Sequence, residues 1–223
     1  MVGMNIEKFL RESIQKNKEE ANLFLLEERN RRVSKLTRSN GLPARFQKKT
    51  FHNYDKTKNT KAFNACLEFT SSFPDTKGIL LLGGVGIGKT HLAAAVVNAL
   101  NENLYSTYFG NVMDVISFVK STYNKSSKLS EIEAINIMTE RIDLLVIDDL
   151  GKENNTEHNL ALLYNIINKL YENEKAIIIT TNYGASDLNH KLGERGRAIV
   201  SRISSMCTPI NLSGKDWRIY NER

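Results

Sequence analysis

Residues 78–90 decide the fold, and they read Gly-Ile-Leu-Leu-Leu-Gly-Gly-Val-Gly-Ile-Gly-Lys-Thr. The apolar residues 78–82 predict a buried strand, and the alanine-rich sequence that follows Thr90 predicts a helix. Residues 83–90 between them have the form G-x-x-x-x-G-K-[ST]. A glycine-rich turn at this position lets backbone N–H groups and the positive end of the helix surround an anion. The stretch therefore predicts a loop that binds the phosphates of a nucleoside triphosphate.

The residues of this loop have distinct expected roles. We expect Lys89 to reach the β- and γ-phosphates, and the Thr90 hydroxyl to ligate Mg²⁺. A glycine-rich turn with a chance Lys-Thr pair is the structural alternative, and the flanking strand and helix argue against it. The residues expected to contact the nucleotide are Gly83, Gly84, Val85, Gly86, Ile87, Gly88, Lys89, Thr90 and His91.

Positive charge is concentrated near the N-terminus. Of the chain's 31 basic and 25 acidic residues, 12 and 6 lie within residues 1–50, which leaves 19 of each for the rest. A basic segment fits a contact with nucleic acid. An acidic patch on a partner protein and a solvated helix face are equally good explanations, so charge alone does not choose among them.

The cysteine count and the hydropathy exclude several classes of protein. Cys66 and Cys207 are the only cysteines, too few for a four-ligand zinc site, and we expect both to be reduced core residues. No apolar run approaches the roughly 18 residues that a membrane span needs. The first residues lack the apolar core of a signal peptide. These features predict a cytoplasmic protein.

The first 40 residues form a unit of their own in the sequence. Residues 4–36 predict a helix, but their apolar side chains are too few for an independent core. We therefore expect a helical arm or hairpin that docks on another protein. A turn signal at residues 39–43 marks the boundary. The expected division is a basic helical arm at 1–40, a connector at 41–57 and an ATPase core at 58–223.

The core alternates apolar strands with helices. This alternation predicts an α/β fold in which helices cover both faces of a five-stranded parallel sheet. The predicted strands are 78–82, 105–109, 144–148, 176–180 and 208–212. The predicted helices are 58–72, 89–101, 111–122, 130–140, 156–173, 185–192 and 194–204.

Polar residues end two of these strands. Asp148 and Asp149 follow the apolar residues 144–147, and Asn182 follows the next strand. Ligands of such sheets bind beyond the carboxyl ends of the strands, so these side chains are expected beside the phosphates. Asp148 suits a hold on Mg²⁺, Asp149 suits polarising the attacking water, and Asn182 suits orienting that water. The alternatives are that Asp149 caps a turn and that Asn182 only forms one.

Three arginines lie close together near the end of the core, at positions 195, 197 and 202. Three solvated arginines are ordinary on a protein surface. Because they follow a strand with a polar tip, one of them is also placed to reach the γ-phosphate of a neighbouring subunit. Such an arginine finger raises the rate about 10³–10⁵-fold where it is present.

In this order, the motifs resemble those of an AAA+ ATPase, and more narrowly those of the DnaC/DnaI bacterial helicase loaders and their phage counterparts. A complete strand between the phosphate loop and the Asp-Asp strand is typical of the additional-strand ATPases. The resemblance covers residues from about 40 to 223. The segments that carry it are 41–46, 50–54, 84–95, 143–151, 181–182, 192–195 and 216–218.

The resemblance implies a role for each motif residue. The nucleotide is ATP or ADP with Mg²⁺, Asp148 and Asp149 form the Walker B pair, and Asn182 is sensor 1. Arg202 is the best match to the arginine finger, with Arg195 and Arg197 as alternatives because the spacing is longer than usual. Arg218 occupies the sensor 2 position. The chain stops soon after the last strand, so the helical lid of larger AAA+ proteins is expected to be absent.

The function that the resemblance implies is the loading of a ring helicase onto single-stranded DNA when replication begins. The arm at 1–40 grips the DnaB-type helicase, the subunits self-associate through the finger, and ATP hydrolysis is slow and stimulated by DNA or the partner. The family's insertion at about 113–140 is the expected DNA contact. Its candidate residues are Lys120, Tyr123, Lys125 and Lys128. A solvated loop explains the same residues equally well.

The chain also departs from the family pattern. Asp149 stands where a Glu is more usual, although DnaI-like members share this form, and the shorter side chain is expected to slow hydrolysis. The arm is short and lacks zinc-binding cysteines, which fits a phage or mobile-element member. Two rival functions stay open, namely an IstB-type transposition helper ATPase and a nucleotide switch that binds a partner without hydrolysis.

Overall fold

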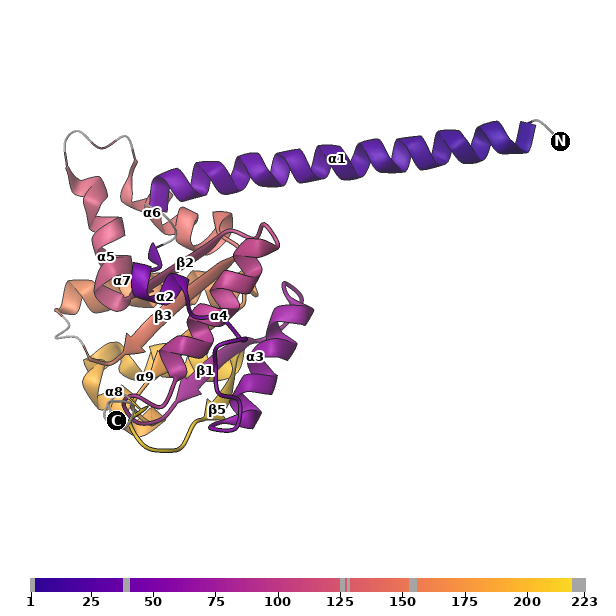
Figure 1. The fold of residues 1–223 in the computed structure, drawn as a ribbon. Helices are drawn as coiled ribbons and strands as arrows, with labels where there is room; N and C mark the ends of the chain where they lie inside the picture. Colours follow the sequence, from indigo (N-terminus) through magenta and orange to yellow (C-terminus); the bar gives the residue numbers. More distant parts are fainter. Residues whose placement is uncertain (1–2, 38–40, 125–126, 128, 153–155, 218–223) are drawn as a thin grey trace.

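The computed structural model describes residues 3–37, 41–124, 127, 129–152 and 156–217, and a five-stranded sheet lies at its centre (Figure 1). The strand order is β2-β3-β4-β1-β5, and every neighbouring pair is parallel. The carboxyl ends of all the strands therefore meet at one edge, as the predicted α/β fold requires. The strands are β1 (Gly78–Leu82), β2 (Thr107–Asn111), β3 (Leu144–Leu150), β4 (Ile177–Thr181) and β5 (Cys207–Asn211).

Both faces of the sheet are covered because its central strands are apolar on both sides. In β3, Leu145 and Ile147 point into one hydrophobic cluster, and Leu144 and Val146 point into the other. The first cluster includes side chains of α5 (Val112–Lys120), α6 (Glu131–Asn136), the π-helix Ile137–Arg141, α7 (Glu157–Glu172), α8 (Ala185–Lys191) and α9 (Gly196–Met206). The second includes α3 (Thr60–Ser72) and α4 (Lys89–Glu102). Two 3₁₀ turns, Ser121–Tyr123 and Gly193–Arg195, complete the core elements.

Among the strands, β2 differs most from its predicted bounds, because it begins and ends two residues later than expected. The Tyr105 N–H donates to the Leu100 carbonyl at the end of α4, and the Ser106 N–H and hydroxyl both donate to the Asp143 carboxylate. These bonds close a turn, so pairing with β3 begins only at Thr107. The apolar pattern alone carries no sign of that turn.

The predicted arm is one continuous helix, α1 (Gly3–Thr37), which extends away from the core (Figure 1). Near its C-terminal end, Arg29 is paired with Asp143 of the core, with 2.6 Å between guanidinium nitrogen and carboxylate oxygen. Several large apolar side chains of α1 are exposed, namely Phe9, Ile14, Leu23, Phe24 and Leu25. The helix therefore has no packing partner for these side chains within the described part of the chain.

The segment after the arm packs on the core. It contains the short helix α2 (Ala44–Gln47), and Leu42 and Tyr54 are buried in the same cluster as α3 and α4. The Asn98 side-chain amide of α4 donates to the carbonyls of Phe46 and Lys49. Residues 42–54 are thus packed on the core, against α3 and α4.

The two cysteines are buried free thiols, as expected for reduced core residues. Across the described residues, the helices lack the combination of length and apolar character that crossing a membrane requires.

Candidate nucleotide-binding site

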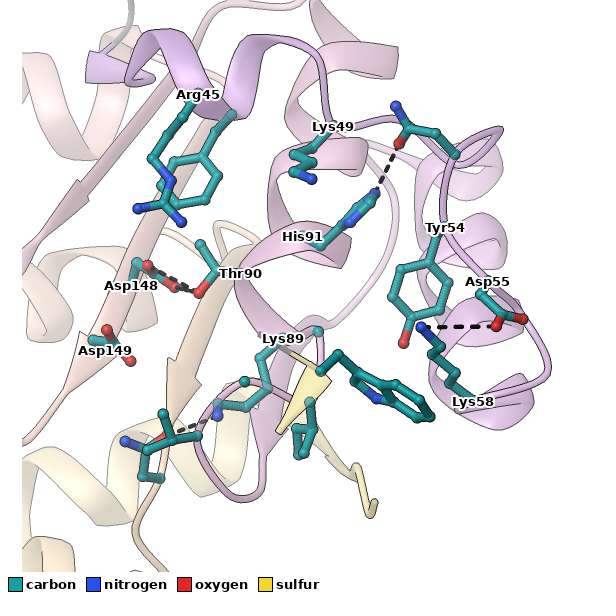
Figure 2. Close-up of a pocket in the computed structure, with 18 of the residues that line it drawn as sticks. Arg45, Lys49, Tyr54, Asp55, Lys58, Lys89, Thr90, His91, Asp148 and Asp149 are labelled. Atoms are coloured by element: carbon teal, nitrogen blue, oxygen red, sulfur yellow. Dashed lines mark hydrogen bonds and ion pairs between the residues drawn. The ribbon is translucent and has the colours of Figure 1, made fainter. Parts of the chain in front are cut away.

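The phosphate loop connects β1 to α4 at the carboxyl edge of the sheet, where the strand order predicts a ligand. Gly88, the residue before α4, has φ = +105°, a conformation that favours glycine. A Cβ atom at Gly88 would lie 2.9 Å from the Tyr54 ring, so a larger residue has no room there. The loop lines a cavity of about 490 Å³, and Figure 2 shows the side chains that surround it.

Lys89 and Asn182, predicted from separate motifs, are in direct contact. The Lys89 ammonium donates to the carbonyls of Gly83 and Gly84, at 2.7 and 2.6 Å, and to the Asn182 side-chain oxygen at 2.7 Å. The Lys89 side chain is buried, so its charge depends on these partners. A polyphosphate in the loop offers the ammonium a stronger, charged acceptor. The arrangement fits a nucleotide site in which sensor and loop are coupled through one lysine.

Thr90 and Asp148 also meet as predicted (Figure 2). The Thr90 hydroxyl lies 3.0 and 3.2 Å from the two Asp148 carboxylate oxygens, and the Thr180 hydroxyl donates to the same carboxylate at 2.6 Å. Burial raises the pKa of Asp148 above its usual value, and the hydrogen bonds from Thr180 and Thr90 oppose that rise. A hydroxyl and a carboxylate side by side are hard oxygen ligands, which fit Mg²⁺. In loops of this kind such a pair holds Mg²⁺ together with the nucleotide phosphates, so Thr90 and Asp148 are the residues that would hold the ion here.

Asp149 lines the same cavity but has a different environment. Its φ is +60°, and the pairing of β3 with β4 shifts register between Ile147 and Leu150. This bulge turns the Asp149 carboxylate away from Asp148 and toward Lys152, whose ammonium lies 2.7 Å away. The Asp149 N–H donates to the Thr180 hydroxyl at 2.9 Å. Thr180 and Lys152 were not predicted as site residues, because neither belongs to the phosphate loop or the acid pair.

His91 contacts residues 50–54. Its Nε2 lies 3.1 Å from the Thr50 carbonyl and 3.0 Å from the Asn53 side-chain oxygen, and its ring meets Tyr54 edge to face. Burial lowers the pKa of His91 below its usual value. His91 therefore links the phosphate loop helix to the segment that walls the cavity.

One wall of the cavity was not predicted as a site. It is formed by Phe46, Tyr54 and Lys58 from residues 41–58, and by Trp217 near the end of the described chain. The signal was present in the sequence, since residues 50–54 and 216–218 carry part of the family resemblance. The first of these segments lies in the predicted connector, and Arg218 is the site residue predicted in the second.

The three candidate arginines lie outside this cavity. Arg195 and Arg197 are exposed, whereas Arg202 is half-buried against α7. The Arg202 Nε donates to the Asn168 side-chain oxygen at 2.6 Å, and another guanidinium nitrogen donates to the Tyr164 hydroxyl at 2.8 Å. A role for any of them at a neighbouring subunit's nucleotide stays a prediction.

The candidate DNA-binding residues do not form one basic surface among the described residues. The Lys120 ammonium donates to the Asn159 side chain of α7 at 2.7 Å. The Tyr123 hydroxyl donates to the Glu131 carboxylate, which places an acid beside the predicted stacking residue. Lys125, Lys128 and the sensor 2 candidate Arg218 lie outside the described residues.

Several known proteins are similar to this chain in both sequence and fold. The chain is 27% identical over 200 residues to the replicative helicase loader DnaC of Escherichia coli strain K12, a match covering 87% of this chain and 77% of that protein. The insertion sequence IS21 putative ATP-binding protein of Pseudomonas aeruginosa is 26% identical over 151 residues, which are 66% of this chain and 55% of that protein. A crystal structure of the DnaC helicase loader matches 77% of this chain and all of its own, with a TM-score of 0.66 and 27% identity. These likenesses confirm the predicted AAA+ fold and the resemblance to DnaC-type loaders.

A family profile extends the likeness over most of the sequence. The profile is described as IstB-like ATP binding protein, and it matches residues 17–223. That range contains the phosphate loop, the Asp148–Asp149 pair and Asn182. The chain therefore belongs to the family of IstB-like ATP binding proteins, and the pocket around Lys89 is its candidate nucleotide site.

Proposed function

We propose that this chain is a helicase loader, an ATPase that holds a replicative ring helicase and times its placement on single-stranded DNA when replication begins. The observation that carries the proposal is α1, which extends from an ATP-binding core with its large apolar side chains exposed. Exposed apolar groups of this size are typical of a surface that another protein covers. The likeness to DnaC supports a helicase as that protein.

The proposed chemistry is the hydrolysis of ATP with Mg²⁺. Lys89 and the loop N–H groups bind the phosphates, and Thr90 with Asp148 holds the metal ion. Asp149 polarises the attacking water, and Asn182 orients it. Copies of the chain assemble so that an arginine near α9 reaches the neighbouring nucleotide. Residues 1–40 serve as the helicase-binding arm, residues 41–57 as the connector, and residues 58–223 as the ATPase.

The test is capture of partners by the intact protein in the presence of ATP and Mg²⁺. We expect the replicative helicase of the host to be retained. The double variant Phe24→Ser, Leu25→Ser should lose it, because both side chains are more than half exposed on α1, at 64% and 62%. The matched control is Lys16→Ser, an exposed arm residue whose change removes no apolar surface. Retention of a transposase in place of the helicase would contradict the loader proposal.

A transposition helper of the IstB type is the second candidate. The family profile and the IS21 protein of Pseudomonas aeruginosa support it, because both concern the ATP-binding protein of an insertion sequence. The nucleotide chemistry is the same in both proposals, so ATPase assays do not distinguish the loader from the transposition helper. The identity of the protein that binds α1 distinguishes them.

A further inference from the structure

The end of the described chain returns to the phosphate loop. After β5, the Leu212 N–H donates to the Leu82 carbonyl at 2.7 Å, and the Ser213 N–H donates to the Asn59 side-chain oxygen at 3.0 Å. The Asn59 amide in turn lies 3.5 Å from the Ile87 carbonyl of the loop. Residues 212–217 are therefore fastened to the loop and to the start of α3.

The contact is tightest at Gly86. The backbone N–H of Trp217 donates to the Gly86 carbonyl at 3.2 Å. Gly86 has φ = +73°, which favours glycine, and a Cβ atom there would lie 1.7 Å from a carboxylate oxygen of Asp216, so glycine lets the Asp216 side chain lie directly against the loop. The position of Trp217 is thus set by the phosphate loop itself.

The Trp217 indole belongs to the wall of the nucleotide cavity. The Lys58 ammonium lies 3.7 Å from the centre of its ring, a cation–π contact, and it is also 3.7 Å from the Asp55 carboxylate. The indole N–H is buried and has no hydrogen-bond partner among the described residues. An aromatic face covered by a long, flexible side chain and a donor without an acceptor both indicate a place for a ligand.

We infer that Trp217 is the platform on which the base of the bound nucleotide stacks, in the place that the Lys58 ammonium takes in this structure. The inference rests on the proposed binding of ATP at the phosphate loop. It assigns the residue that contacts the base of that nucleotide. Phosphate is recognised by N–H groups and Lys89, whereas a flat, neutral ring suits a flat, neutral base. A purine offers the indole more stacking area than a pyrimidine.

The chain provides its own probe, because Trp217 is its only tryptophan. Titration of the intact protein with ATP should change the intrinsic fluorescence. Inorganic tripolyphosphate, which carries the phosphates without a base, should displace bound ATP without reproducing that change. An identical fluorescence change with tripolyphosphate contradicts stacking.

Affinities measured by calorimetry complete the test. Base–aromatic stacking corresponds to about a five- to 150-fold difference in affinity. We expect Trp217→Ala to weaken ATP by about tenfold or more, to leave tripolyphosphate unchanged and to abolish the preference for ATP over CTP. Trp217→Phe, which keeps an aromatic ring, should retain most of the affinity and the preference. Tyr171→Ala is the control, because Tyr171 is an exposed aromatic residue of α7 outside the cavity.

Two failures are distinguishable. Equal affinities of wild type and Trp217→Ala for ATP, or an equal loss for ATP and tripolyphosphate, overturn the inference while the proposed ATP binding stands. If wild type binds neither compound, the nucleotide site and the inference fall together.

Discussion

Lys89 is the residue on which the nucleotide site depends most. Its ammonium joins the loop carbonyls of Gly83 and Gly84 to Asn182 at the tip of β4, and it is buried. The sequence predicted that Lys89 reaches the β- and γ-phosphates and that Asn182 orients the attacking water beside them. It did not predict that they are bonded to each other, because that contact depends on the relative position of two strands.

We expect Lys89→Ala to abolish nucleotide binding, because the loop then loses the buried ammonium that compensates the polyphosphate. Calorimetry with ATP and Mg²⁺ measures this directly. Lys56→Ala, an exposed lysine outside the cavity, is the matched control and should bind as wild type does. Nucleotide affinity at the wild-type level in Lys89→Ala would contradict the assignment.

Asp149 is the residue that we propose to polarise the attacking water. In this structure its carboxylate is paired with Lys152. We expect Asp149→Asn to keep ATP binding and to lose turnover, because the amide cannot accept a proton from water. Phosphate release measured with and without single-stranded DNA tests this. If wild type itself releases no phosphate in either condition while it binds ATP, the protein is a nucleotide switch and not an ATPase.

His91 predicts a pH dependence of stability. Its pKa in the folded protein lies below its usual 6.5, so the unfolded chain binds a proton more readily. The free energy of unfolding should therefore fall as the pH drops below about 6.5, and the fall ends below the folded pKa. Urea unfolding of wild type and His91→Gln over this range measures the effect, which is expected to disappear in the variant. Equal pH slopes for the two proteins would show that His91 does not contribute.

At the scale of elements, the interface between α7 and α9 holds the candidate arginine finger. Arg202 of α9 is bonded to Asn168 and Tyr164 of α7, and its guanidinium carbon lies 4.7 Å from the centre of the Tyr164 ring. These partners of Arg202 could not be predicted from the arginine cluster, because residues on α7 and α9 are far apart along the chain. If Arg202 is an arginine finger that acts on a neighbouring subunit, its guanidinium has to leave Asn168 and Tyr164 or to move together with α7.

We expect Arg202→Ala to bind ATP normally and to lose the turnover that depends on assembly, by about 10³-fold or more. The measurement is phosphate release as a function of protein concentration. Arg197→Ala, an exposed arginine of the same helix, serves as the comparison. Undiminished turnover in Arg202→Ala moves the finger to Arg195 or Arg197.

Elements with strong periodicity were predictable, and those set by tertiary contacts were not. Strand β1 has the predicted bounds because its apolar run ends at the glycines of the loop. The bulge at Asp149 and the late start of β2 arise from hydrogen bonds to Thr180 and Asp143, which are distant in sequence. The packing of residues 42–54 was missed for the same reason, since their aromatic side chains are buried only when α3 and α4 are in place.

For the whole molecule, the phosphate loop and the alternating strands were enough to predict the α/β fold and the edge of the sheet where ligands bind. They were not enough to predict the wall that Trp217 contributes, because only the folded chain brings residues 212–217 back to the loop. The structure thus combines a nucleotide site at one edge of the sheet with a helix that extends from the core. We propose that ATP bound at this edge of the sheet controls the partner that α1 binds.

Helicase loading in a purified system tests this claim most directly. The host's replicative helicase, closed circular single-stranded DNA, ATP and the intact protein are combined, and helicase bound to DNA is counted after a high-salt wash. The account predicts loading that requires wild-type protein with ATP and that is lost with Lys89→Ala and with Phe24→Ser, Leu25→Ser. Equal loading without the protein, or undiminished loading with Lys89→Ala, would contradict it.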